Sequence, residues 1–239
     1  IGAYDVSLDR SDEAAPMKGV DPVRLRVRHA TSGKLLFDTL PNESPLIASV
    51  TDLTAHEARG MAKVTVRRRD VCRLAHFSSA QPASKGITFS GVLTCGTGKQ
   101  EFTLRIAEHS STSGNAVALS VALGSGPADQ ISLRAASTPE EQVFGGGQQF
   151  SRFNLKGQRL PIIASEQGVG RGKQPLTWLA NLTNNGAGGS WHTSYAGVPH
   201  VLTSGLRSIF IDTHDYVTMN FADARVLQFD VNARALTSI

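Results

Sequence analysis

The sequence predicts an all-β fold, an antiparallel β-sandwich, and three observations lead to this prediction. Apolar and polar residues alternate with a period of two from Tyr4 to Leu133, as they do in half-buried strands. Each run is five to nine residues long and is bounded by glycine, proline, serine or asparagine, which favour turns. Long amphipathic helices are not expected, and residues 51–58 are predicted to form a short helix at most.

The predicted strands follow one another with short turns between them. Before residue 140 the alternating runs lie at residues 23–28, 63–67, 87–93, 102–106, 116–121 and 131–133. The clearest turns between them are at residues 31–34, 96–99, 113–115 and 124–127. Alternation resumes at residues 206–211, 216–221 and 225–231. One face of such strands is buried and the other is wet, which is typical of two packed sheets.

Composition excludes some classes of function. The chain has 239 residues, 18% of them charged, a net charge of +4 and a pI near 9.3. The densest basic run, Arg67-Arg68-Arg69, is interpreted as a solvated strand end, because no aromatic residues are interleaved with it for base stacking. We therefore expect no nucleic-acid partner. No apolar run approaches the roughly 20 residues of a membrane helix, so no membrane span is expected.

Two cysteines and two sequons bear on the compartment. Cys72 and Cys95 allow one disulfide, with two buried thiols as the alternative. Asn42 and Asn181 begin Asn-x-Ser/Thr triplets and are candidate glycosylation sites. The chain starts at Ile1 without a signal-peptide segment, which we interpret as a processed product or a fragment. Together these features favour a secreted or periplasmic protein.

A glycine-rich segment interrupts the strand pattern. Residues 144–173 hold seven of the 23 glycines, and their polar side chains are mostly amides and guanidiniums. We predict one domain over residues 1–239, with a functional loop region at about 144–205. A domain boundary near residue 140 is an alternative that the pattern does not require.

No catalytic, cofactor or metal motif is complete. Residues 168–173 resemble a phosphate-binding loop, but Gln167 and Gln174 stand where its glycine and hydroxyl residues are needed. The seven histidines lack the spacing of metal ligands, and the serine elbow Gly-x-Ser-x-Gly is absent. Glu141 and Glu166 form a carboxylate pair only if the fold brings them together. We therefore predict no catalytic residue, metal or cofactor in this chain.

Two motifs resemble a known family. Residues 144–157, Phe-Gly-Gly-Gly-Gln-Gln-Phe-Ser-Arg-Phe-Asn-Leu-Lys-Gly, and residues 165–172, Ser-Glu-Gln-Gly-Val-Gly-Arg-Gly, are similar to the N-terminal domain of glycoside hydrolase family 31. Within it they most resemble the bacterial α-glucosidase branch that includes the sulfoquinovosidases. The resemblance is sharp over about residues 140–222 and only architectural before that. One position departs from the family, because Gln148 replaces the glutamate of Gly-Gly-Gly-Glu-Gln-Phe.

This resemblance implies a fold, an activity and a partner. Family members are retaining α-glycosidases in which a galactose-mutarotase-like β-sandwich precedes a (β/α)8 barrel that carries both catalytic aspartates. The chain would then be the non-catalytic N-terminal part, inactive alone, with the barrel in the same precursor or in a second chain. The implied substrate is an α-glycoside and no cofactor is implied. The alternative function is a stand-alone carbohydrate-binding sandwich.

The resemblance also points to site residues. In the family a loop of this domain borders the active site, so Gln149, Gln167 and Arg171 are expected to hydrogen-bond sugar hydroxyls or an anionic group. Alternatively, Arg152, Glu166 and Arg171 tie the loop to its own sandwich or to the barrel.

Apolar and aromatic residues of the same segment are expected to meet a partner. Trp178 and Trp191 either stack on sugars or pack between domains. Residues 160–163 are predicted to form an exposed apolar patch for a partner domain, whereas a stand-alone sandwich would be well hydrated there.

Overall fold

The computed structural model describes residues 1–10, 23–41, 43–96, 98–111, 114–184 and 186–239. One short helix and many strands make up these residues. They are β1 (Tyr4–Arg10), β2 (Val23–His29), β3 (Leu35–Asp38), β4 (Leu46–Ala58), β5 (Met61–Ala83), β6 (Gly86–Thr94), β7 (Lys99–Ser111), β8 (Gly114–Leu123), β9 (Gln130–Ala136), β10 (Val143–Gly147), β11 (Arg159–Ile162), α1 (Leu176–Thr183), β12 (Gly197–Thr203), β13 (Ser208–Asp212), β14 (Val217–Asn220), β15 (Val226–Val231) and β16 (Ala235–Ser238).

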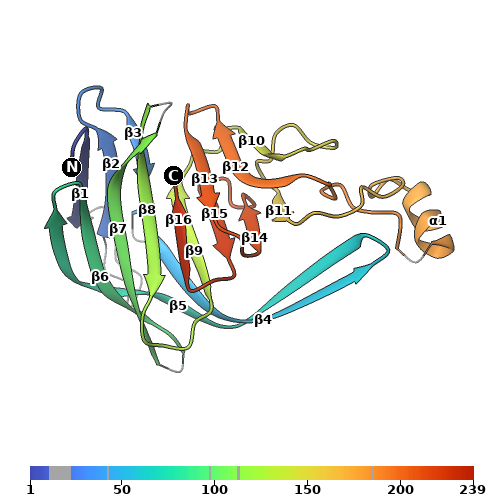
Figure 1. Ribbon diagram of the computed structural model, residues 1–239, viewed down its shortest axis with the longest axis horizontal. Helices are drawn as coiled ribbons and strands as arrows, with labels where there is room; N and C mark the ends of the chain where they lie inside the picture. The colour runs from blue at the N-terminus through green and yellow to red at the C-terminus, as the bar shows by residue number, and fades with distance from the viewer. Residues whose placement is uncertain (11–22, 42, 97, 112–113, 185) are drawn as a thin grey trace.

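The strands form two antiparallel sheets (Figure 1), and the prediction of an antiparallel β-sandwich is confirmed. The small sheet has the order β1-β2-β3. The large sheet has 13 strands in the order β10-β12-β13-β16-β8-β7-β6-β5-β4-β9-β15-β14-β11. Its last strands in sequence complete the sheet begun by the first ones, since β15 pairs with β9 and β16 with β8. Its ends approach each other, where Ala164 forms a parallel bridge with Ser194.

Alternation along the strands builds the core between the sheets. Leu25 and Val27 of β2 are buried while Arg24 and Arg26 reach the edge and pair with Asp38 and Asp9. Their apolar partners come from the large sheet and include Leu104, Ile106, Leu119, Leu133 and Phe229. Burying alternate side chains from both sheets is the main stabilising contribution of such a fold.

A hairpin projects from the sandwich, at the right of Figure 1. Residues 51–67 of β4 and β5, which we call the arm, pair in register from Asp52 with Arg67 to Ala58 with Met61. Most arm side chains are exposed on both faces. The short helix predicted at residues 51–58 is therefore wrong. The β-branched residues Val64, Thr65 and Val66 on the facing strand favour pairing over helix.

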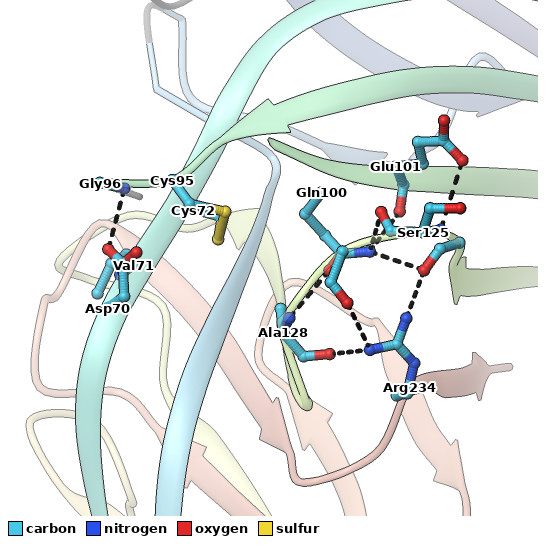
Figure 2. The surroundings of a disulfide bond; sticks show 12 residues. Asp70, Val71, Cys72, Cys95, Gly96, Gln100, Glu101, Ser125, Ala128 and Arg234 are labelled. Atoms are coloured by element: carbon cyan, nitrogen blue, oxygen red, sulfur yellow. Dashed lines mark hydrogen bonds between the residues drawn. A yellow bond between two sulfur atoms is a disulfide. The ribbon is translucent and has the colours of Figure 1, made fainter. Parts of the chain in front are cut away.

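Figure 2 shows the base of this region, where Cys72 of β5 and Cys95 after β6 form a disulfide. Asp70 accepts hydrogen bonds there from the amides of Val71 and Gly96. Nearby, the fully buried Gln100 amide holds the turn between β8 and β9. Its Nε2 donates to the carbonyls of Glu101, Gly124 and Ser125, and its Oε1 accepts from the Ala128 amide.

The region at 144–205 is more regular than its composition predicts. It contains β10, β11, α1 and β12. The patch predicted at residues 160–163 is wrong for Leu160, which is fully buried in the core where β11 pairs with β14, while residues 161–163 are half-buried. Large exposed apolar residues lie on α1 and in the loops around it, and others lie on the arm, on β12 and on β13.

Some sequence predictions fall on residues outside the described ranges. The candidate glycosylation site Asn42 is one of them, and so are Thr97 and Ser113 of two predicted turns. Asn181, the other candidate, lies in α1, and its Oδ1 accepts a hydrogen bond from the Gly188 amide.

Candidate functional site: the lobe beside the arm

The loops between β10 and β12 form a lobe that extends beside the arm (Figure 1). We use this name for residues 148–158 and 163–196; β11 lies between these two parts and returns to the sandwich. The lobe begins and ends at one point, because Gly147 pairs with Gly197 at a β-bulge. The sandwich thus holds both ends of the lobe in one place.

Close backbone approach explains two glycines at this junction. Gly146 and Gly147 have φ of 78° and 82°, a conformation that side chains disfavour. A Cβ on Gly146 would lie 2.3 Å from Leu160 Cδ2, and one on Gly147 would lie 2.0 Å from the Ala196 carbonyl oxygen. The composition of this turn is therefore required by packing as well as by dihedral angles.

Backbone hydrogen bonds hold the turn at Gln148. Its amide donates to Ala196 O at 2.9 Å, and its carbonyl accepts from Ser194 Oγ at 2.7 Å. The next residue, Gln149, donates from Nε2 to Gly146 O, while its Oε1 is buried and has no hydrogen-bond partner among the described residues. A buried acceptor without a donor is costly, which makes Gln149 a candidate for contact with another group.

Arg171 connects the distant parts of the lobe. Its Nη1 donates to Thr193 O at 2.6 Å and to Gln167 O at 3.3 Å, and its Nη2 donates to Trp191 O at 2.8 Å. Gln167 contributes its carbonyl here and accepts a further bond from Thr193 Oγ1 at 2.6 Å. A guanidinium has five N–H donors in a fixed plane, and here it uses them on the chain's own carbonyls.

Arg171 also reaches the first part of the lobe. Its Nε donates to Ser151 Oγ at 3.3 Å, and its Cζ lies 4.9 Å from the centroid of the Phe150 ring. Burial lowers the pKa of Arg171, but a guanidinium remains charged at neutral pH. Burial lowers the pKa of His192, and the positive charge of Arg171 lowers it further. The lobe is thus organised around one cation.

Glu166 links the lobe to the tip of the arm. Its amide donates to Gly60 O at 2.8 Å, and the Ala62 amide donates to Ser165 Oγ at 3.0 Å. The hydroxyl of Tyr195 donates to the Glu166 carboxylate, a hydrogen bond that raises the pKa of the tyrosine. Between arm and lobe lies a cleft of about 500 Å³, whose polar lining includes His56, Lys63, Asn181, Ser190 and His192.

The structure does not bring Glu141 and Glu166 together as a carboxylate pair. Glu141 lies at the base of the lobe, where it forms a salt bridge with Arg207 at 2.5 Å. Arg207 Nη1 also donates to Ala136 O, and Ser137 Oγ donates to the Glu141 carboxylate at 2.6 Å. Glu166 instead contacts Tyr195 and the arm. The two carboxylates have separate structural partners.

Glu141, at the base of the lobe, is expected to make the stability of the protein depend on pH. Burial alone would raise the pKa of Glu141, but hydrogen bonds from Arg207 and Ser137 outweigh it and lower the pKa. The unfolded chain has a glutamate pKa of about 4.3. The stabilisation is therefore complete above that pH and is lost as pH falls through the lower folded value. In thermal melts, we expect the difference in Tm between wild type and Glu141→Gln to be constant above about pH 5 and to become smaller below about pH 4. A difference in Tm that grows on acidification would contradict this.

Sequence reasoning missed α1 and several partners of the lobe. A helix signal was present, because Pro175 precedes Leu176, Leu179 and Leu182 at helical spacing. Nothing in the sequence paired Tyr195 with Glu166 or Arg207 with Glu141, which are far apart along the chain. Trp191 is half-buried, and the Cζ of Arg152 lies 5.3 Å from the centroid of its ring, whereas Trp178 is exposed.

The described residues contain neither a clustered set of metal ligands nor a membrane-spanning helix. No three His, Cys, Asp or Glu side chains among them are grouped so that they can hold a metal ion. In the same part of the chain, no helix is long and apolar enough to span a membrane.

Comparison with known proteins gives partial matches in sequence. No family model matches the chain. A sulfoquinovosidase of Escherichia coli (strain K12) is 37% identical over 95 residues, which are 39% of this chain and 14% of the relative. A sulfoquinovosidase of Agrobacterium fabrum (strain C58) is 27% identical over 143 residues, covering 52% of this chain and 21% of the relative. The matches therefore span only a small part of each relative.

The match in fold covers nearly the whole chain. A family 31 sulfoquinovosidase from E. rectale, solved with an aza-sugar inhibitor, superposes with a TM-score of 0.73 at 16% identity. It covers 98% of this chain and 32% of that one. At this identity the superposition establishes the fold, and the shorter sequence matches add the relationship. This chain is therefore related, in sequence and in fold, to part of the sulfoquinovosidases of glycoside hydrolase family 31.

Proposed function

We propose that this chain is the N-terminal, non-catalytic part of a retaining α-glycosidase, with a sulfoquinovoside as the favoured substrate. The observation that carries the proposal is the fold match, which spans 98% of this chain but 32% of a sulfoquinovosidase. The two sulfoquinovosidase sequence matches support the choice of substrate over other α-glycosides. On this proposal, bond cleavage occurs in a catalytic barrel outside these residues.

The lobe supplies the chain's contribution in this proposal. It borders the active site of the barrel, held in place by the Arg171 hydrogen bonds and by the contact between Glu166 and the arm. Gln149, whose Oε1 has no partner in the described structure, and Gln167 are the amides proposed to face the barrel or the sugar. Arg171 acts mainly as a positioning residue, because its donors are already engaged.

The proposal includes the compartment. The disulfide between Cys72 and Cys95 is of a kind that persists in oxidising surroundings. We therefore propose a secreted or periplasmic enzyme. Thiol alkylation of protein taken directly from its host, with and without reductant, tests this; a freely alkylated Cys72 would contradict it.

The second candidate is a stand-alone carbohydrate-binding sandwich. Exposed aromatic rings favour it, because rings of this kind offer flat apolar faces to sugars. The exposed rings of the lobe are Phe150, Phe153, Trp178 and Tyr195. This candidate predicts saturable binding of a sugar by the chain alone, measured by calorimetry.

An activity assay separates the two candidates. The 239-residue chain should not hydrolyse an aryl α-glucoside or an aryl α-sulfoquinovoside, whereas the polypeptide with its barrel should hydrolyse the sulfoquinovoside. Intact mass of the native preparation shows whether the barrel is part of the same chain or a second one. Turnover by the chain alone that disappears in Glu141→Gln or Glu166→Gln would overturn the proposal.

A further inference from the structure

The orientation of α1 is inverted relative to an ordinary surface helix. A helix on a water-soluble protein normally buries its apolar stripe and exposes its polar one. In α1 the buried residues are Thr177 and Ala180, while the large apolar residues are exposed. These are Leu176 (56%), Trp178 (61%), Leu179 (51%) and Leu182 (67%).

Polar contacts fix this orientation. Thr177 Oγ1 accepts a hydrogen bond from the Gly172 amide at 2.8 Å, and Asn181 Oδ1 accepts from the Gly188 amide at 2.9 Å. The backbone approaches closely on the same side, since a Cβ on Gly188 would lie 2.5 Å from the Thr177 carbonyl oxygen. Rolling the helix to bury its leucines would break these bonds and create clashes. The sequence therefore keeps the apolar face outward.

The exposed face carries no charge that would suit it to water. None of the eight residues of α1, Leu-Thr-Trp-Leu-Ala-Asn-Leu-Thr, is ionisable. Val169, in the neighbouring glycine-rich loop, is exposed as well. Exposed apolar surface of this kind, on a lobe that extends away from the sandwich (Figure 1), is typical of an interface.

The size of the face indicates which occupant it fits. Stable complexes between separate proteins bury about 800 Å² on each partner, from about 20 to 30 residues. An eight-residue helix offers far less than this. A domain on the same polypeptide needs a smaller contact, because tethering holds it at an effective concentration of about millimolar. The fold match occupies only 32% of a sulfoquinovosidase, which leaves two thirds of such a chain as a possible occupant.

We propose that the face of α1 formed by Leu176, Trp178, Leu179 and Leu182 docks on the catalytic domain of the same polypeptide. This inference rests on the proposed function and names the surface that joins the two parts. It replaces residues 160–163 as the contact site for the partner domain. The lobe is then fixed at its base by the sandwich and at its tip by the partner.

Hydroxyl-radical footprinting of the complete polypeptide tests the inference. Labelling at each site is normalised to the same peptide in the urea-unfolded protein. Leu206 is the internal reference, because it is 78% exposed on a turn of the sandwich, and Leu53 of the arm is a second one. From their exposed fractions in this chain, Trp178 and Leu182 should be labelled about as strongly as the reference leucines. In the complete polypeptide we expect their labelling to be at least fivefold lower than that. Labelling in proportion to that exposure would overturn the inference.

A variant and its control sharpen the result. Leu182→Asp should restore labelling at Trp178 at least threefold, while Leu206→Asp, a matched change elsewhere, should leave it unaltered. Protection that disappears on dilution together with a dimer in sedimentation would assign the face to a second copy instead. Protection that appears only with added oligosaccharide would assign it to a sugar. Either outcome overturns the inference, whereas the proposed function is judged separately by glycoside hydrolysis in the same sample.

Discussion

Replacing Glu141 by leucine is expected to lower the free energy of unfolding by about 3 to 5 kcal/mol, because it leaves the buried Arg207 guanidinium without a counter-charge. Arg207 is held by both Glu141 oxygens, at 2.5 and 3.1 Å, and both side chains are largely buried. The pair joins the segment before β10 to the segment before β13, so its loss loosens the base of the lobe. Urea denaturation followed by circular dichroism measures the change.

Two further variants separate the ion pair from other effects of the substitution. Glu140→Leu changes an exposed neighbouring carboxylate and should alter stability by less than about 0.5 kcal/mol. Glu141→Leu combined with Arg207→Leu should recover much of the loss, since removing both partners leaves no buried unpaired charge. If the double variant is as unstable as the sum of the single ones, the pair is not the cause.

Arg171→Ala is expected to open the lobe without unfolding the sandwich. The change removes a charged donor from the carbonyls of Gln167, Trp191 and Thr193. At about 1.5 to 3 kcal/mol for each hydrogen bond to a charged group, losing two or three of them lowers the local opening free energy by about 3 to 9 kcal/mol. Hydrogen exchange should therefore speed up by at least a hundredfold at the Val169 amide, which donates to Ala187 O.

The comparison for this variant lies within the same molecule. Amides of β7 and β8, which pair from Phe102 with Leu123 to Ser111 with Gly114, should exchange at the wild-type rate, because Arg171 does not contact them. Arg152→Ala, which removes only the cation over the Trp191 ring, should change lobe exchange by tenfold or less. Unaltered exchange at Val169 in Arg171→Ala would show that the lobe is held by other contacts.

Much of the sandwich was predictable because one face of each strand is wet. Val23, Leu25 and Val27 alternate with arginines, and all three are buried. Prediction failed where this rule does not apply. The arm is exposed on both faces, so residues 51–58 show no alternation and were assigned to a possible helix. Leu160 lies in a glycine-rich segment whose composition predicts exposure, although pairing of β11 with β14 buries it.

The sequence predicted which segment holds the candidate site, but it did not predict which groups contact one another there. The glycines and amides of residues 144–173 predict a functional loop, and the structure places residues 148–158 and 163–173 of that segment in the lobe. The role of Arg171 depends on backbone carbonyls up to 22 residues away, and every residue type has such a carbonyl. Sequence patterns therefore cannot name these acceptors.

The sequence by itself determined that the chain is all-β, which strands bury which face, and which motifs relate it to a glycosidase family. Period-two alternation and the glycine spacing of the turns are local properties, so the residue order records them. Only the tertiary structure decided that the Arg171 guanidinium is used inside the lobe and that α1 turns Trp178 and its leucines outward. Both outcomes depend on hydrogen bonds between segments distant in sequence, which fix the polar side of the helix and leave its apolar side for a partner.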